Sequence, residues 1–214
     1  MFFKWTWSNT DIICYLFFMP IKMPTQRRSE QRVKLILDTA SSVLIQEGYE
    51  RLNTNYLAER CSIPVSSIYQ YFKNKEEIVA RILEIRREER NHLLKHKILD
   101  LKKTSLEAMV EGLIRVLVEH IKQAPRLERI LAEKQFSLPM QKSEREFNAD
   151  LIRLLEHYII LNHLHFNVSD TRLALRILVS SIKAACIDLF IDDQAFDNEQ
   201  IVKELKAMTL KYVR

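Results

Sequence analysis

The chain contains only two glycines, Gly48 and Gly112, among its 214 residues. Average usage of about 7% would give roughly fifteen. Glycine lets a backbone wrap a phosphate group or reverse in a tight hairpin. With two glycines so far apart, the chain cannot form a Walker loop, a dinucleotide-binding fingerprint or the nucleophile turn of many hydrolases. The sequence therefore predicts an all-α fold whose turns lack glycine.

The net charge and the cysteines indicate which partners and which redox compartment suit the protein. The formal net charge is +5 and the isoelectric point is about 9.1. This basic balance permits a nucleic acid or another acidic surface as partner. Cys14, Cys61 and Cys186 are far apart and odd in number, so they form neither a CxxC pair nor a disulfide framework. A reducing compartment, the cytoplasm, fits this usage best.

Residues 1–25 differ in composition from the rest and contain both tryptophans and an apolar run at 12–19. A signal peptide is one interpretation. However, Asp11 precedes the run, no Ala-x-Ala site follows it, and eight apolar residues cannot span a bilayer. A membrane-associated anchor is a second interpretation. A gene start placed too early, with Met19 or Met23 as the natural initiator, is the one we favour.

Apolar residues at helical spacing predict nine helices after this segment. Gly48 stands where the first helix needs a left-handed terminator. We expect Thr54 to cap the second helix, Pro64 to lie in the first turn of the third, and Pro125 to stop the fifth. The predicted ranges are 29–47, 54–61, 65–71, 76–99, 105–124, 127–136, 143–164, 170–191 and 198–212.

Residues 29–78 contain the sharpest motif. Three short helices, with a four-residue turn between the second and the third, describe a helix-turn-helix. The stretch YLAERCSIPVSSIYQYFKNKEEIVARI resembles the N-terminal domain of the TetR family of one-component regulators through Leu57-Ala58, Glu59, the run from Ile68 to Phe72, and Lys75-Glu76. Ser62 stands where glycine is usual in the turn and Pro64 where serine is usual. A left-handed serine costs some strain but is compatible with the turn.

The resemblance implies a bacterial-type transcriptional repressor that binds double-stranded DNA. A recognition helix needs small or polar groups at its N-terminal end to enter the major groove. Basic residues before the first helix are suited to an arm over the neighbouring groove, and a helix N-terminus is suited to a phosphate. We expect Ile68 and Phe72 to lie in the core. The candidate DNA-binding residues are Arg27, Arg28, Thr54, Val65, Ser66, Ser67, Tyr69, Gln70, Tyr71 and Lys75.

The resemblance also implies the domain plan. After the 1–25 extension, residues 26–75 form the DNA-binding domain and residues 76–214 form a helical effector-binding and dimerisation domain. The last two long helices make a four-helix bundle with a second copy, and the nearly all-apolar helix at 170–191 supports this. A small, mostly apolar effector releases the dimer from a palindromic operator. The candidate effector-binding residues are Arg115, His120, Phe136, Phe147, His157 and Tyr158.

Two other classes of protein remain alternatives. An enzyme or metal protein would use His92 and His96, four residues apart, or the looser group of His157, His163 and His165. Neither group has the further ligands of a metal centre, so we expect solvated faces, no cofactor and no catalysis. The other alternative is a helical interaction protein anchored by residues 1–19, but we expect no stable membrane association.

Overall fold

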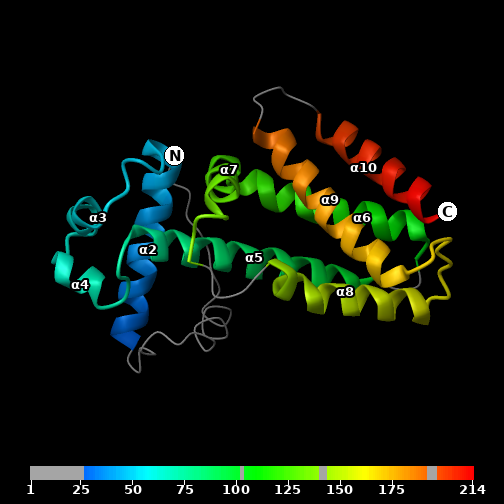
Figure 1. The fold of residues 1–214 in the computed structure, drawn as a ribbon, viewed down its shortest axis with the longest axis horizontal. Coiled ribbons are helices and arrows are strands. Elements are labelled where there is room, and N and C mark those ends of the chain that lie inside the picture. The colour runs from blue at the N-terminus through cyan, green and yellow to red at the C-terminus, as the bar shows by residue number, and fades with distance from the viewer. Residues whose placement is uncertain (1–26, 102–103, 140–143, 192–196) are drawn as a thin grey trace. The chain divides into compact units, whose positions relative to one another are not determined.

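The computed structural model describes residues 27–101, 104–139, 144–191 and 197–214 (Figure 1). The predictions for residues 1–25 therefore lie outside the described residues. All regular secondary structure in the described ranges is helical, as predicted. The helices are α2 (Arg27–Glu47), α3 (Thr54–Cys61), α4 (Val65–Tyr69), α5 (Lys75–Asp100), α6 (Leu106–Gln123), α7 (Pro125–Lys134), α8 (Glu144–Leu161), α9 (Thr171–Ile191) and α10 (Asn198–Val213).

Two helix ends differ from the prediction for clear reasons. α7 begins at Pro125 rather than at 127, so this proline starts a helix as well as following the end of α6. Its missing N–H is harmless there, since the first helical N–H has no partner within the helix. α8 stops at Leu161 rather than 164, because His163 adopts a left-handed φ of 52° and Leu164 N–H donates to the carbonyl of Ile159 at 3.0 Å.

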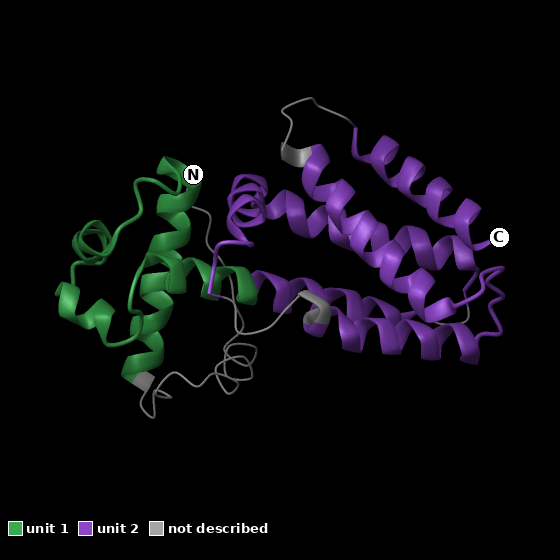
Figure 2. Cartoon of the chain, viewed as in Figure 1, with its two compact units in different colours: residues 1–85 green, residues 86–214 purple. Residues whose placement is uncertain are grey.

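The chain divides into two compact units, residues 1–85 and 86–214 (Figure 2). The division falls inside α5, further along the chain than the expected boundary at 75. Ile78, Val79 and Ile82, in the first turns of α5, are buried and belong to the first unit.

The core of the first unit is built by α2, α3, α4 and the first turns of α5. α2 has an apolar stripe at helical spacing, and all its members are buried: Val33, Ile36, Leu37, Ala40, Val43 and Leu44. α2 packs against α3 and α3 against α4. Leu57 of α3 and Ile68 of α4 are fully buried, and so is Leu52 in the preceding turn.

α9 occupies the centre of the second unit, where it contacts α6, α7, α8 and α10. One core cluster joins side chains of α5, α6, α8, α9 and α10, including Leu117, Leu155 and Leu205. Burial raises the pKa of Cys186, a free cysteine inside this cluster, to about 12. No helix among the described residues is long and apolar enough to cross a membrane.

Candidate nucleic-acid interface and ligand cavity

The turn between α3 and α4 has the geometry of a helix-turn-helix. α3 ends at Cys61 and is followed by its C-cap residue, Ser62. Ser62 has a left-handed φ of 54° and ψ of 45°, and its N–H donates to the carbonyls of Ala58 and Glu59. Serine thus adopts the conformation for which the family usually has glycine. Pro64, with φ −59° and ψ 141°, stands before α4 as its N-cap and not inside its first turn as predicted.

The N-terminus of α3 is capped by Asn53, not by Thr54 as predicted. The Asn53 backbone is extended, and its Oδ1 accepts a hydrogen bond from Tyr56 N–H at 2.9 Å. Thr54 is the first residue inside the helix, so its hydroxyl is available for another partner. Thr54 Oγ1 forms a hydrogen bond of 3.0 Å with the hydroxyl of Tyr69 on α4. This bond joins two of the candidate DNA-binding side chains.

α4 is shorter than predicted and ends at Tyr69 instead of Tyr71. Ile68 and Phe72 are buried, as predicted, and they fix the inner face of this segment. The outer face consequently exposes Ser66, Tyr69 and Gln70, whereas Val65, Ser67 and Tyr71 are half-buried. The side chains that could reach a DNA groove thus lie on one surface of the first unit.

The basic candidates differ in their surroundings. Arg28 is exposed, and the side chain of Arg27 lies outside the described residues. Lys75 Nζ lies 4.3 Å from the centre of the Tyr49 ring, and the Tyr49 hydroxyl donates to Glu76 Oε1 at 3.3 Å. The ring holds the Lys75 ammonium by a cation–π interaction.

Lys73 is a cation beside α4 that is not among the predicted DNA-binding residues. Its side chain is 87% exposed, and it lies in the turn that follows α4. Its backbone N–H donates to Glu77 Oε2 at 2.8 Å, while Glu77 N–H donates to Asn74 Oδ1 at 2.9 Å. These bonds fix the backbone of the turn, and the largely exposed Lys73 side chain also forms an ion pair, with its Nζ 3.8 Å from Glu77 Oε1. Its position a few residues after α4 could have identified Lys73 as a candidate DNA-binding residue from the sequence.

An ion-pair cluster holds α3 against α2. Tyr56 donates its hydroxyl hydrogen to the Glu47 carboxylate at 2.9 Å, and Arg60 Nη1 donates to Glu47 Oε1 at 3.1 Å. These contacts complement the buried packing of the same helices.

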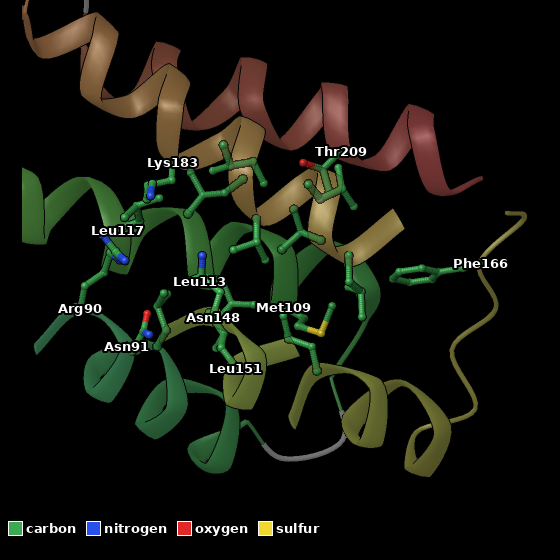
Figure 3. A pocket seen from close by; sticks show the side chains of 18 residues that line it. Arg90, Asn91, Met109, Leu113, Leu117, Asn148, Leu151, Phe166, Lys183 and Thr209 are labelled. Atoms are coloured by element: carbon green, nitrogen blue, oxygen red, sulfur yellow. The ribbon is translucent and has the colours of Figure 1, made fainter. Parts of the chain in front are cut away.

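The second unit contains a partly open cavity of about 90 Å³ (Figure 3). Its lining comes from α5, α6, α8, α9, α10 and the segment between α8 and α9. The apolar lining residues are Leu94, Met109, Val110, Leu113, Ile114, Leu117, Leu151, Leu155, Phe166, Leu175, Leu178, Val179 and Ile182. The polar lining residues are Arg90, Asn91, Asn148, Lys183 and Thr209.

The predicted effector-binding residues are not among the described residues that line this cavity. Arg115 pairs with Glu111 and Glu199. Phe136 is 93% exposed and His157 is also exposed. The predicted role of these residues stays untested.

The other predicted effector residues lie in different surroundings. Tyr158 is buried, and its hydroxyl lies 2.9 Å from Thr104 Oγ1. His120 is buried. The side chain of Phe147 lies outside the described residues. Helical periodicity identified apolar stripes, but it did not indicate which stripes leave a space between them.

His120 belongs to a buried polar cluster. Arg86 donates from Nε to Glu128 Oε1 at 2.7 Å and from Nη2 to the His120 carbonyl at 3.0 Å. Within the described part of the chain, neither ring nitrogen of His120 has a hydrogen-bond partner. Burial, followed by the charges of Arg86 and Arg90, lowers the pKa of His120 to about 3. The imidazole is therefore neutral at physiological pH.

The histidines considered for a metal site gather only as a pair. His92 and His96 are exposed on α5, with their Nε2 atoms 3.1 Å apart. Among the residues that the structure describes, no group of three or more His, Cys, Asp or Glu side chains is arranged to hold a metal ion.

Two family comparisons agree with this architecture. Residues 36–82 match the family described as "Bacterial regulatory proteins, tetR family", and residues 105–212 match "Tetracyclin repressor-like, C-terminal domain". The chain belongs to the TetR family. TetR-family proteins are DNA-binding transcriptional regulators that bind small-molecule effectors and form dimers, and they are generally not enzymes.

A curated relative extends the comparison. The HTH-type transcriptional regulator YvkB of Bacillus subtilis is 33% identical over 73 residues, which are 34% of this chain and 39% of YvkB. The chain thus spans about two fifths of that relative's length in the match.

The solved structures cover more of the chain. The fatty acid degradation regulator FadR from Bacillus halodurans has a TM-score of 0.65 and 18% identity, over 84% of this chain and 94% of its own. SmeT, the repressor of the Stenotrophomonas maltophilia multidrug efflux pump SmeDEF, has a TM-score of 0.64 and 20% identity, over 85% and 90%. At these identities the likeness establishes the TetR fold alone.

Proposed function

We propose that this TetR-family chain is a repressor that binds a palindromic operator as a dimer and leaves it when a small molecule fills the cavity of the second unit. The observation that carries the proposal is the cavity itself, in a chain whose first unit is a helix-turn-helix. A mostly apolar cavity with a few polar groups is the usual form of a small-molecule site.

The exposed face of α4 supplies the DNA contacts in this proposal. Ser66 and Gln70 are suited to base edges, because their hydroxyl and amide groups donate and accept hydrogen bonds. Tyr69, Lys73 and Lys75 are suited to phosphates, which fix the register of the protein on the duplex.

A second copy of the chain covers α9 and α10 in this proposal. On α9, Leu173 is 54% exposed and Ile177 is 44% exposed, one helical turn apart. On α10, Met208 and Tyr212 are 42% and 44% exposed, again four residues apart. A palindromic operator requires a two-fold symmetric protein, with half-sites about 34–36 Å apart or a multiple of that spacing.

Release follows from a population shift. A ligand that binds the DNA-incompetent state more tightly draws the dimer off the operator. A full reversal of occupancy needs about a 10⁴-fold difference in affinity, roughly 5.5 kcal/mol. α5 contains both Lys75 and the cavity residue Arg90, so we infer that movement of α5 couples the cavity to DNA binding.

Selection of genomic fragments by the full chain, followed by footprinting, tests the operator. We expect a short palindrome that Tyr69→Ala abolishes and that Ile160→Ala, at a 70% exposed residue of α8, leaves unchanged. Lys73→Ala should weaken binding to all sequences and reduce the salt slope by about 1. Weak binding without sequence preference would contradict the proposal. Transcription from a reporter carrying the palindrome distinguishes a repressor from an activator.

A further inference from the structure

The wall of the cavity in the second unit consists almost entirely of apolar atoms. Thirteen of its eighteen described lining residues are apolar, and they come from α5, α6, α8, α9 and the segment between α8 and α9. The nitrogen and oxygen atoms of the other five contribute almost no surface to the cavity. A ligand inside it would therefore contact carbon atoms and the Met109 thioether almost exclusively.

The five polar lining residues have partners inside the chain. Thr209 donates its hydroxyl hydrogen to the carbonyl of Leu205 at 2.7 Å, one turn earlier in α10. The other four also interact with groups of the chain: Arg90, Asn91, Asn148 and Lys183. Figure 3 shows Arg90 and Lys183 at one edge of the lining side chains. The wall therefore offers a polar group of a ligand almost no surface with which to form a hydrogen bond.

The core around the cavity disfavours charge. Leu94, Met109 and Leu155 line the cavity and belong to the same core cluster as Cys186. Burial in that cluster raises the pKa of the Cys186 thiol to about 12, because its thiolate would be desolvated. An ionised ligand would suffer a similar loss of solvation in the cavity. Even a ligand hydroxyl would lose its hydrogen bonds to water without replacement.

We propose that the cavity binds an uncharged, hydrocarbon-like molecule, a short aliphatic chain or a single ring without a polar head group. This inference rests on the proposed function in taking the cavity as the effector site, and it adds that polar groups on the ligand weaken binding. The volume of about 90 Å³ is below the ~150 Å³ of an engineered apolar cavity that holds benzene. A short chain therefore fits the space, and the flexible Met109 thioether allows the wall to adjust to a ring.

Matched ligands and a methionine reporter test this selectivity. NMR of isotope-labelled methionine methyl groups in the full chain follows Met109, and Met109→Leu assigns its signal by removing it. The chain series is pentane, butanol, butylamine and butanoate, and the ring series is toluene, phenol, benzylamine and benzoate. We expect at least one hydrocarbon to shift the Met109 signal and to bind about tenfold or more tightly than its hydroxyl analogue. The ammonium and carboxylate analogues should bind weakest.

The same titrations can overturn the inference. Absence of hydrocarbon binding, or equal or tighter binding of a polar analogue in each series, would show that the apolar wall does not select the ligand. Val179→Phe should abolish the hydrocarbon shift by filling the cavity. Ile160→Phe, at a 70% exposed residue of α8, is the matched control and should bind like wild type. An equal effect of both variants overturns the assignment to this cavity, and if Val179→Phe fails to fold, the order of wild-type affinities decides.

Release of an operator fragment, followed by fluorescence anisotropy, separates this inference from the proposed function. Hydrocarbon binding without release supports the ligand class and contradicts effector release. Release by a polar ligand, with no hydrocarbon binding, supports the proposed function and overturns the ligand class.

Discussion

Gly48 and Ser62 both have a positive φ, but only one of them is glycine. Gly48 has φ 89°, and a Cβ there would meet nothing within 4 Å among the described residues, so the cost of a side chain is conformational alone. Gly48→Ala should lower the free energy of unfolding by about 1–2 kcal/mol. Ser62→Gly should raise it by about 0.5–1 kcal/mol, since relief of the left-handed serine exceeds the added chain entropy.

Urea unfolding at fixed protein concentration measures both changes. Gly112→Ala is the comparison, because Gly112 lies inside α6 and its added Cβ would meet the flexible Lys97 side chain at 2.9 Å. Its change should be near zero or favourable, since alanine is the better helix former. A loss as large as that of Gly48→Ala would contradict the conformational explanation.

His120 gives a second prediction at the residue scale. Its folded pKa of about 3 lies below the unfolded value of about 6.5. The unfolded state therefore binds more protons between these values, and stability falls as pH falls below about 6.5. His120→Leu removes this loss, so its advantage over wild type should grow by about 2 kcal/mol between pH 8 and pH 5.

Urea unfolding at pH 8 and pH 5 checks this prediction, with exposed His157→Leu as the control position. An advantage of His120→Leu that does not change with pH would mean that His120 does not govern the acid sensitivity.

At the scale of elements, α9 carries the prediction about assembly. Leu173→Glu combined with Ile177→Glu should convert the dimer to a monomer, because two carboxylates would be desolvated in the proposed interface. Sedimentation equilibrium measures the change. Leu99→Glu, at a 68% exposed apolar residue of α5, is the matched control and should leave the dimer intact. A dimer that survives the double substitution would place the interface elsewhere.

At the scale of the whole molecule, thermodynamic linkage between effector binding and operator binding gives a prediction that does not depend on any single residue. If a small-molecule effector weakens operator binding by some factor, saturating operator must weaken effector binding by the same factor. Calorimetric titration with and without operator DNA measures it. Unequal factors would show that the two ligands do not share one two-state equilibrium.

The spacing of residues a few positions apart was sufficient to predict the helices and the helix-turn-helix. The stripe from Val33 to Leu44 has a helical period, and the buried positions of Ile68 and Phe72 follow from the same spacing. The capping residue was misjudged, because Asn53 and Thr54 are both good caps and only the backbone decides between them.

By itself, the sequence determined the all-α class, the helix periods and the DNA-binding motif, because each depends on residues a few positions apart. Only the tertiary structure decided the cavity. Arg90 and Lys183 come from helices far apart in the chain, and no local pattern brings them together. A cavity is the space that packed side chains leave unfilled, so it depends on all the surrounding helices at once.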